Sequence, residues 1–128
     1  MHLNTPTSPG EFLDKLTILE IKSERIADPA KLANVRHELD ALRATWAASP
    51  LAARDVSALV ARLKAVNQTL WDIEDRIRRH EADQRFDTTF IDLARAVYRT
   101  NDDRAAIKRE LNVALGSDLL EEKSYTPY

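Results

Sequence analysis

Glycine is almost absent from this chain of 128 residues, which contains only Gly10 and Gly116. At an average usage of about 7%, a chain of this length would carry about nine glycines. Glycine-rich phosphate loops, dinucleotide-binding fingerprints and hairpin-rich β folds need glycine where the backbone takes positive φ. The scarcity excludes these classes and favours a helical protein. We expect both glycines to mark helix ends and neither to lie at a functional site.

Cysteine and long apolar runs are absent as well. Without cysteine, the chain has neither a disulfide framework nor a thiolate metal site. The longest unbroken apolar run, Ala58 to Ala61, has four residues, whereas a membrane helix needs about 20. The first ten residues lack the basic and apolar regions of a signal peptide. We therefore expect a cytoplasmic protein with no membrane association.

Neither sign of charge dominates, because the chain has 19 Lys and Arg residues and 21 Asp and Glu residues. The net charge of −2 argues against nucleic-acid binding driven by bulk charge. Hydrophobic residues make up 44% of the chain, too many for a disordered protein. One folded domain over residues 1–128 is expected.

Capping residues divide the chain into helices. Ser8, Asp28 and Ser49 each precede a proline, and Asp87 precedes the last apolar segment. They predict helices over Pro9 to about Ala27, Pro29 to about Ala48, about Val56 to Gln84, and Thr88 to Leu115, with a short turn from Pro50 through Asp55. The last helix either continues to Leu115 or breaks at Thr100–Asp103, which would give five helices. The last twelve residues, SDLLEEKSYTPY, are expected to lie across the surface.

Apolar residues recur at alternating steps of three and four in two of these segments. This spacing is typical of helices that pack along a narrow apolar seam. The short, proline-marked connections favour antiparallel neighbours. The sequence therefore predicts an all-α antiparallel helical bundle with coiled-coil-like seams, made by Leu32, Val35, Leu39, Leu42 and Trp46 and by Leu59, Leu63, Val66, Leu70, Ile73 and Ile77.

Polar residues interrupt the apolar faces of three helices. On a wheel of about 100° per residue, Asn67 and Glu74 fall in the middle of the apolar face of the third helix, with Arg78 beside them. Charge within an apolar face must pair, face a cavity or meet a ligand, because a lone buried ion costs several kcal/mol. The candidate site residues are Glu20, Asn67, Glu74, Arg78, Asn101, Arg104 and Lys108.

These residues have two interpretations. In the first, Glu20, Glu74, Arg78 and Arg104 form a structural network of ion pairs and hydrogen bonds that fixes the helix register. In the second, Arg78, Arg104 and Lys108 line a pocket between helices for a small anionic molecule.

Histidine does not point to a metal site. The three histidines, His2, His37 and His80, are scattered, and Gln84 stands where a zinc-protease helix would carry its second histidine. We expect all three on the surface, and we expect no metal and no cofactor. The arginines between Arg76 and Arg85 alternate with acidic residues, which is typical of a solvated helix face and not of a nucleic-acid interface.

Four segments carry a resemblance to a known family. PGEFLDKLTILEIKSERI, LWDIEDRIRRHE, FDTTFIDLARAVYRTNDDRAAIKREL and EEKSY resemble an uncharacterised family of small bacterial proteins, a domain of unknown function, over nearly the whole chain. The resemblance implies no activity, substrate or cofactor. It implies recurrent polar positions at Glu11, Asp14, Lys15, Thr17, Glu20, Lys22, Asn67, Trp71, Glu74, Asp75, Arg78, Asp87, Tyr98, Asn101, Asp102, Arg104 and Lys108.

Two functions remain open. The first is a non-catalytic binding or assembly module that forms a homo-oligomer or binds a protein partner through the first helix, where Ile18 and Ile21 widen the apolar surface. The second is a small-molecule binding protein or enzyme whose Arg, Lys and Glu side chains hold an anionic ligand between helices.

Overall fold

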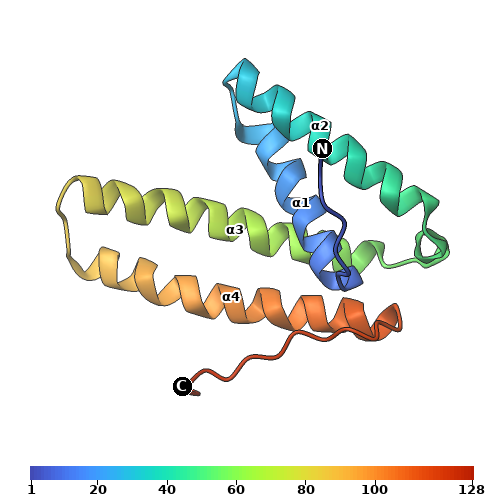
Figure 1. The fold of residues 1–128 in the computed structure, drawn as a ribbon. Helices are drawn as coiled ribbons and strands as arrows, with labels where there is room; N and C mark the ends of the chain where they lie inside the picture. The colour runs from blue at the N-terminus through green and yellow to red at the C-terminus, as the bar shows by residue number, and fades with distance from the viewer.

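The protein is all-helical, as the sequence predicts. The computed structural model describes residues 1–128 and contains no strand. Its elements are α1 (Pro9–Arg25), α2 (Pro29–Ala48), the short 3-10 helix η1 (Pro50–Ala53), α3 (Ser57–Ala82) and α4 (Thr88–Ala114) (Figure 1).

The predicted caps set the helix starts. Ser8 Oγ accepts a hydrogen bond from the backbone N–H of Glu11, and Asp28 accepts one from that of Lys31. Asp87 caps α4 by accepting from Phe90. These side chains satisfy backbone donors that have no partner within the helix.

The last helix is continuous through Thr100–Asp103, so the alternative with a break there and five helices does not occur. Gly116 follows α4 with φ of 66°, as expected for a residue that ends a helix.

The helices form two pairs that cross. Figure 1 shows α3 and α4 side by side in opposite directions, with α1 crossing them and α2 beyond α1. α1 packs against α2, α3 and α4, whereas α2 packs only against α1 and η1. The antiparallel bundle with coiled-coil-like seams is therefore not confirmed, because in such a bundle α2 would also contact α3 or α4.

Two buried apolar clusters share α1. The larger consists of Leu13 from α1, Leu63 from α3, and Ile107, Leu111 and Leu115 at the end of the chain's last helix. The smaller contains Leu16, Leu19 and Leu39 and joins α1 to α2. Ile21, on another side of α1, is also fully buried. The wide apolar surface of this helix is thus used mainly inside the molecule.

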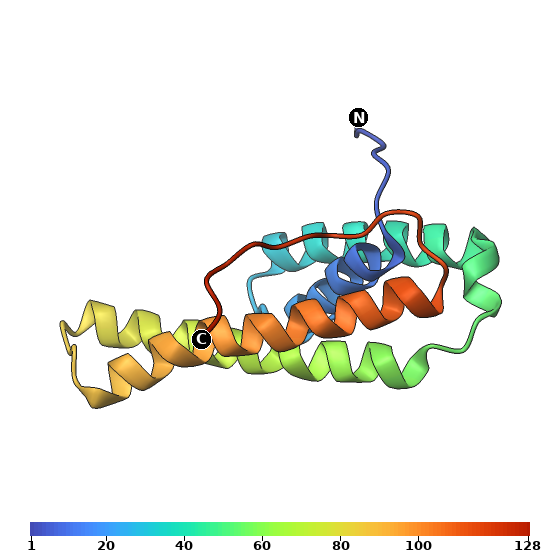
Figure 2. The same cartoon turned by 90° about the horizontal axis from the view of Figure 1, so that it is seen from below.

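The α3–α4 pair extends past the end of α1 (Figure 2). α1 has 17 residues, whereas α3 has 26 and α4 has 27. The face of α3 that meets α1 near Leu63 is therefore left open further along, near Arg78. None of the helices combines the length and the apolar character that crossing a bilayer requires.

Candidate functional site

A buried carboxylate joins three helices at the centre of the molecule. The side chain of Asp14, on α1, is 2% exposed. Arg104, on α4, donates two hydrogen bonds to it, from Nε to Oδ1 at 2.8 Å and from Nη2 to Oδ2 at 2.5 Å. Asn67, on α3, donates a third bond to Oδ1 at 3.0 Å. A bidentate arginine and an amide therefore hold this carboxylate in one orientation.

The neighbouring polar atoms are also paired. The same Asn67 Nδ2 lies 3.0 Å from Thr17 Oγ1, and the Thr17 hydroxyl donates to the backbone carbonyl of Asp14 at 2.8 Å. No buried side-chain nitrogen or oxygen in the structure lacks a hydrogen-bond partner. The network of Asp14, Thr17, Asn67 and Arg104, called the Asp14 network below, is thus satisfied by the protein itself.

Electrostatics keep both ends of the central pair charged. Burial on its own raises the pKa of the Asp14 carboxyl, but the hydrogen bonds from Arg104 and Asn67 outweigh burial and hold this pKa below its ordinary value. The hydrogen bond to Asp14 raises the pKa of the Arg104 guanidinium. The pair is therefore ionised at neutral pH.

A second group of contacts fastens the start of α1 to the end of α4. The backbone N–H of Gly10 donates to Asn112 Oδ1 at 2.7 Å. Lys108 Nζ lies 2.6 Å from a carboxylate oxygen of Glu11 and 3.0 Å from one of Glu121, in the segment after α4. Gly10 marks the start of α1, as expected, and it also packs against the end of α4.

The remaining candidate residues lie further out. Glu74 and Arg78 pair with each other at 3.3 Å on α3, where their side chains are 44% and 79% exposed. Glu20 lies 3.4 Å from Lys64 Nζ and 3.9 Å from Arg43. Neither acid contacts Arg104. The predicted network of Glu20, Glu74, Arg78 and Arg104 is therefore not the one that forms.

Asn101 belongs to the edge of the Asp14 network. Its Oδ1 lies 3.5 Å from Arg104 Nη1, one turn away on α4. Of the seven candidates, Asn67 and Arg104 bind Asp14, Asn101 contacts Arg104, and Lys108 lies on the same side of α4 one turn further along.

An open groove lies beside the Asp14 network, where α3 and α4 pass the end of α1. Its volume is about 390 Å³. Apolar side chains of α1 and α3 and charged side chains of α1, α3 and α4 line it together. The lining residues are Ile18, Ile21, Lys22, Asn67, Leu70, Trp71, Glu74, Asp75, Arg78 and Arg104.

Reasoning from the helical wheel missed Asp14, Glu11 and Asn112 as site residues. The most regular apolar stripe of α1 consists of Phe12, Leu16 and Leu19. A second series with helical spacing, Asp14, Thr17, Ile18 and Ile21, faces α3 and α4, and this series contains the buried acid. The sequence carries a signal for this acid, because Asp14 is the one charged residue on a second face that it shares with Thr17 and two isoleucines.

His80 is buried, so the expectation that all three histidines lie on the surface is wrong for this one. Its Nδ1 lies 3.0 Å from the carbonyl oxygen of Arg76, and its own carbonyl accepts from the backbone N–H of Arg85 at the end of α3. Nowhere in the structure do three or more His, Asp or Glu side chains converge as metal ligands would.

Comparison with known proteins places the chain in a family. No curated protein and no solved structure matches it. A family of unknown function, DUF6165, matches residues 3–128, which is nearly the whole chain and includes the Asp14 network and the groove. The chain belongs to this family of unknown function, DUF6165.

Proposed function

We propose that this protein is a non-catalytic binding module. Its groove between α1, α3 and α4 takes up apolar side chains of a protein partner. The Asp14 network holds the three helices that form the groove.

The composition of the groove carries this proposal. Ile18, Ile21, Leu70 and Trp71 supply apolar surface. Most of the charges around them already have partners: Arg104 pairs with Asp14, Arg78 with Glu74, and Asp75 with Arg79. An apolar centre within a compensated polar rim is the usual anatomy of a protein–protein interface.

A small anionic ligand is the second candidate, because two donors in the groove have spare capacity. Lys22 forms no ion pair in the structure, and Arg104 Nη1 has only the long contact of 3.5 Å with Asn101. These two side chains could hold a carboxylate or phosphate group. We rank this function second because only one unpaired cation, Lys22, supports it, whereas binding of a protein partner would involve the apolar and polar residues of the whole groove.

Site-specific photocrosslinking in cells that produce this protein tests the proposal. A photoreactive amino acid replaces Trp71 in the groove or, as the control, Arg36 on the exposed side of α2. We expect a discrete protein adduct from position 71 and none from position 36. The substitution Ile18→Lys, at a half-buried position in the groove wall, should suppress the adduct.

Adducts of equal yield at both positions would contradict the proposal, and so would no adduct at all. The mass of the adduct separates a second copy of the chain from a different protein. In parallel, a rise in unfolding temperature with an anionic metabolite, lost in Lys22→Gln, would favour the second candidate. A ligand at 100 times its dissociation constant adds about 2.7 kcal/mol to the stability.

A further inference from the structure

The last twelve residues cover a different surface from the groove. After Gly116 the chain turns back and runs without secondary structure along α4 and across its junction with α1 (Figure 2). We call residues 117–128 the tail. Although the tail lies on the protein, every residue from Asp118 onward is exposed.

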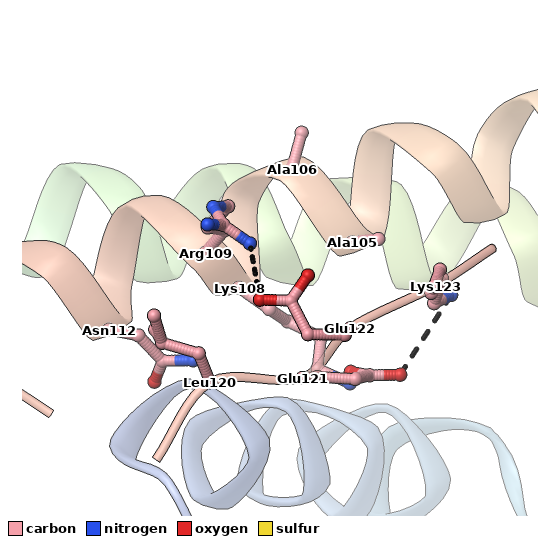
Figure 3. A pocket seen from close by; sticks show the side chains of 9 residues that line it. All are labelled: Ala105, Ala106, Lys108, Arg109, Asn112, Leu120, Glu121, Glu122 and Lys123. Atoms are coloured by element: carbon pink, nitrogen blue, oxygen red, sulfur yellow. Dashed lines mark hydrogen bonds and ion pairs between the residues drawn. The ribbon is translucent and has the colours of Figure 1, made fainter. Parts of the chain in front are cut away.

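Charge and one aromatic pair hold the tail. Glu121 lies 3.0 Å from Lys108 Nζ, and Glu122 lies 3.7 Å from Arg109. The pair of Arg109 and Glu122 stands at the centre of Figure 3. At the far end the Tyr128 ring meets the Tyr98 ring edge to face, with centroids 5.1 Å apart, and its hydroxyl donates to Asp102.

The tail does not fill the surface beneath it. A cavity of about 240 Å³ remains between the tail and α4, where Ala105 and Ala106 leave space (Figure 3). Tyr125 and Tyr128 are 80% and 75% exposed, and Leu119 and Leu120 are 42% and 46% exposed, so much of the apolar surface of the tail stays in contact with solvent. The two glutamates that hold it keep 47% and 75% of their side chains exposed, and ion pairs in contact with water contribute little to stability. The tail is therefore held weakly enough to be displaced.

We propose that the α4 surface under the tail is a binding site for an extended acidic segment of a protein partner, and that the tail competes with this partner from within the same chain. The segment would carry two adjacent carboxylates, as Glu121 and Glu122 do, and an aromatic residue near its end, as Tyr128 is.

The chemistry of the surface selects this class of partner. When the tail leaves, Arg109 loses its one ion-pair partner and Lys108 keeps only Glu11. Two cations on adjacent residues suit two adjacent carboxylates. Tyr98 lies further along the same strip of α4 and gives an aromatic side chain a stacking partner. Ala105 and Ala106 lie between Tyr98 and the two cations, and their small side chains leave room for side chains larger than those of the tail.

Binding of a labelled peptide to the full chain tests this site. The peptide has the sequence of residues 117–128, SDLLEEKSYTPY. The double variant Glu121→Lys, Glu122→Lys weakens the tethered tail. It should bind the peptide at least tenfold more tightly than the wild-type chain, in which the tail competes at an effective concentration on the order of millimolar. A peptide with both glutamates changed to lysine is the control and should not bind.

Three results would overturn the proposal. The first is equal affinity of the peptide for the wild-type chain and the double variant. The second is unchanged binding after Arg109→Glu is added to the double variant, since Arg109 is exposed and its loss should remove one contact. The third is a concentration-dependent dimer of the wild-type chain that the double variant abolishes, since this would assign the surface to a second copy. The substitution Ile18→Lys in the groove should leave peptide binding unchanged, which separates this site from the proposed function.

Discussion

At the level of single residues, the Asp14–Arg104 pair is the interaction whose loss should destabilise the protein most. Its acid is buried on α1, its base comes from α4, and Asn67 of α3 completes the contact. Removing one partner of a buried pair costs about 3–5 kcal/mol, because the other charge is left without compensation. Arg104 retains 29% exposure of its side chain, so water offsets part of this cost.

We therefore expect Arg104→Gln to lower the free energy of unfolding by about 2–3 kcal/mol, measured by urea denaturation. Arg78→Gln is the matched control, because that arginine is 79% exposed and pairs only within its own helix. Its effect should stay within about 0.5 kcal/mol. The double variant Asp14→Asn, Arg104→Gln should lose less than the sum of the single losses. Equal effects of the two arginines would contradict the assignment of Arg104 to the Asp14 network.

The same pair predicts a dependence of stability on pH. The folded state holds the pKa of Asp14 below that of the unfolded chain. A depressed pKa stabilises the protein above the unfolded-state pKa, and this contribution disappears as the pH falls through the folded-state pKa. We expect the stability of the wild type to decline below about pH 5. The decline should be shallower in Asp14→Asn, with urea midpoints compared between pH 6 and pH 3. Parallel curves would show that Asp14 does not contribute.

How far the sequence predicts the site depends on the residue. Asn67 and Arg104 could be identified because they interrupt apolar faces. Glu74 lies on the same face of α3 as Asn67, but it is beyond the part that α1 covers, so it faces the groove and pairs with Arg78. A helical wheel gives the angle of a residue around the axis. It does not give the position along the axis at which a partner helix ends.

At the level of the helices, Gly10 shows why α1 and α4 can approach closely. A Cβ atom at this position would lie 2.5 Å from the backbone oxygen of Lys108 and 2.8 Å from Asn112 Oδ1. The first neighbour is backbone and cannot rotate away. The close approach also allows the hydrogen bond from Gly10 N–H to Asn112.

We expect Gly10→Ala to destabilise the protein by about 1–3 kcal/mol in thermal or urea unfolding, since helices in contact must separate. Helix propensity alone predicts the opposite sign, because alanine is favoured over glycine by about 1 kcal/mol. Ala30→Gly is the control: Ala30 is exposed and also follows the first proline of its helix. It should lose no more than about 1 kcal/mol. A Gly10→Ala variant more stable than the wild type would show that the contact can relax.

The helices themselves were predictable, and their packing was not. Ser8, Asp28 and Asp87 mark helix starts through local hydrogen bonds that the sequence alone encodes. The crossing of the two helix pairs depends on contacts between distant residues, such as Gly10 with Asn112, that no local pattern contains. The regular apolar spacing of the second helix suggested a seam in a bundle, but only Leu39 of α2 is fully buried.

At the level of the whole molecule, α1 is the centre and α2 is an outer layer. α1 contacts every other α-helix and supplies buried side chains to both apolar clusters. α2 rests on α1 and η1 alone, and its attachment to α1 centres on Leu39. The α3–α4 pair and α1 can therefore keep the Asp14 network intact while α2 opens, because none of the four network residues comes from α2.

This arrangement predicts that α2 opens more easily than the other helices. Regions with few buried apolar contacts exchange their amide hydrogens at lower free-energy cost than the core does. Hydrogen exchange followed by mass spectrometry should show faster exchange in residues 29–48 than in the α3 segment around Leu63, which is fully buried. Leu39→Ala should accelerate exchange in α2 strongly while leaving that segment of α3 little changed, whereas Leu63→Ala should accelerate exchange in α1, α3 and α4 together. Equal protection of α2 and α3 in the wild type would mean that the two layers unfold as one unit. In that case the stability of α2 would have to come from the rest of the molecule through α1.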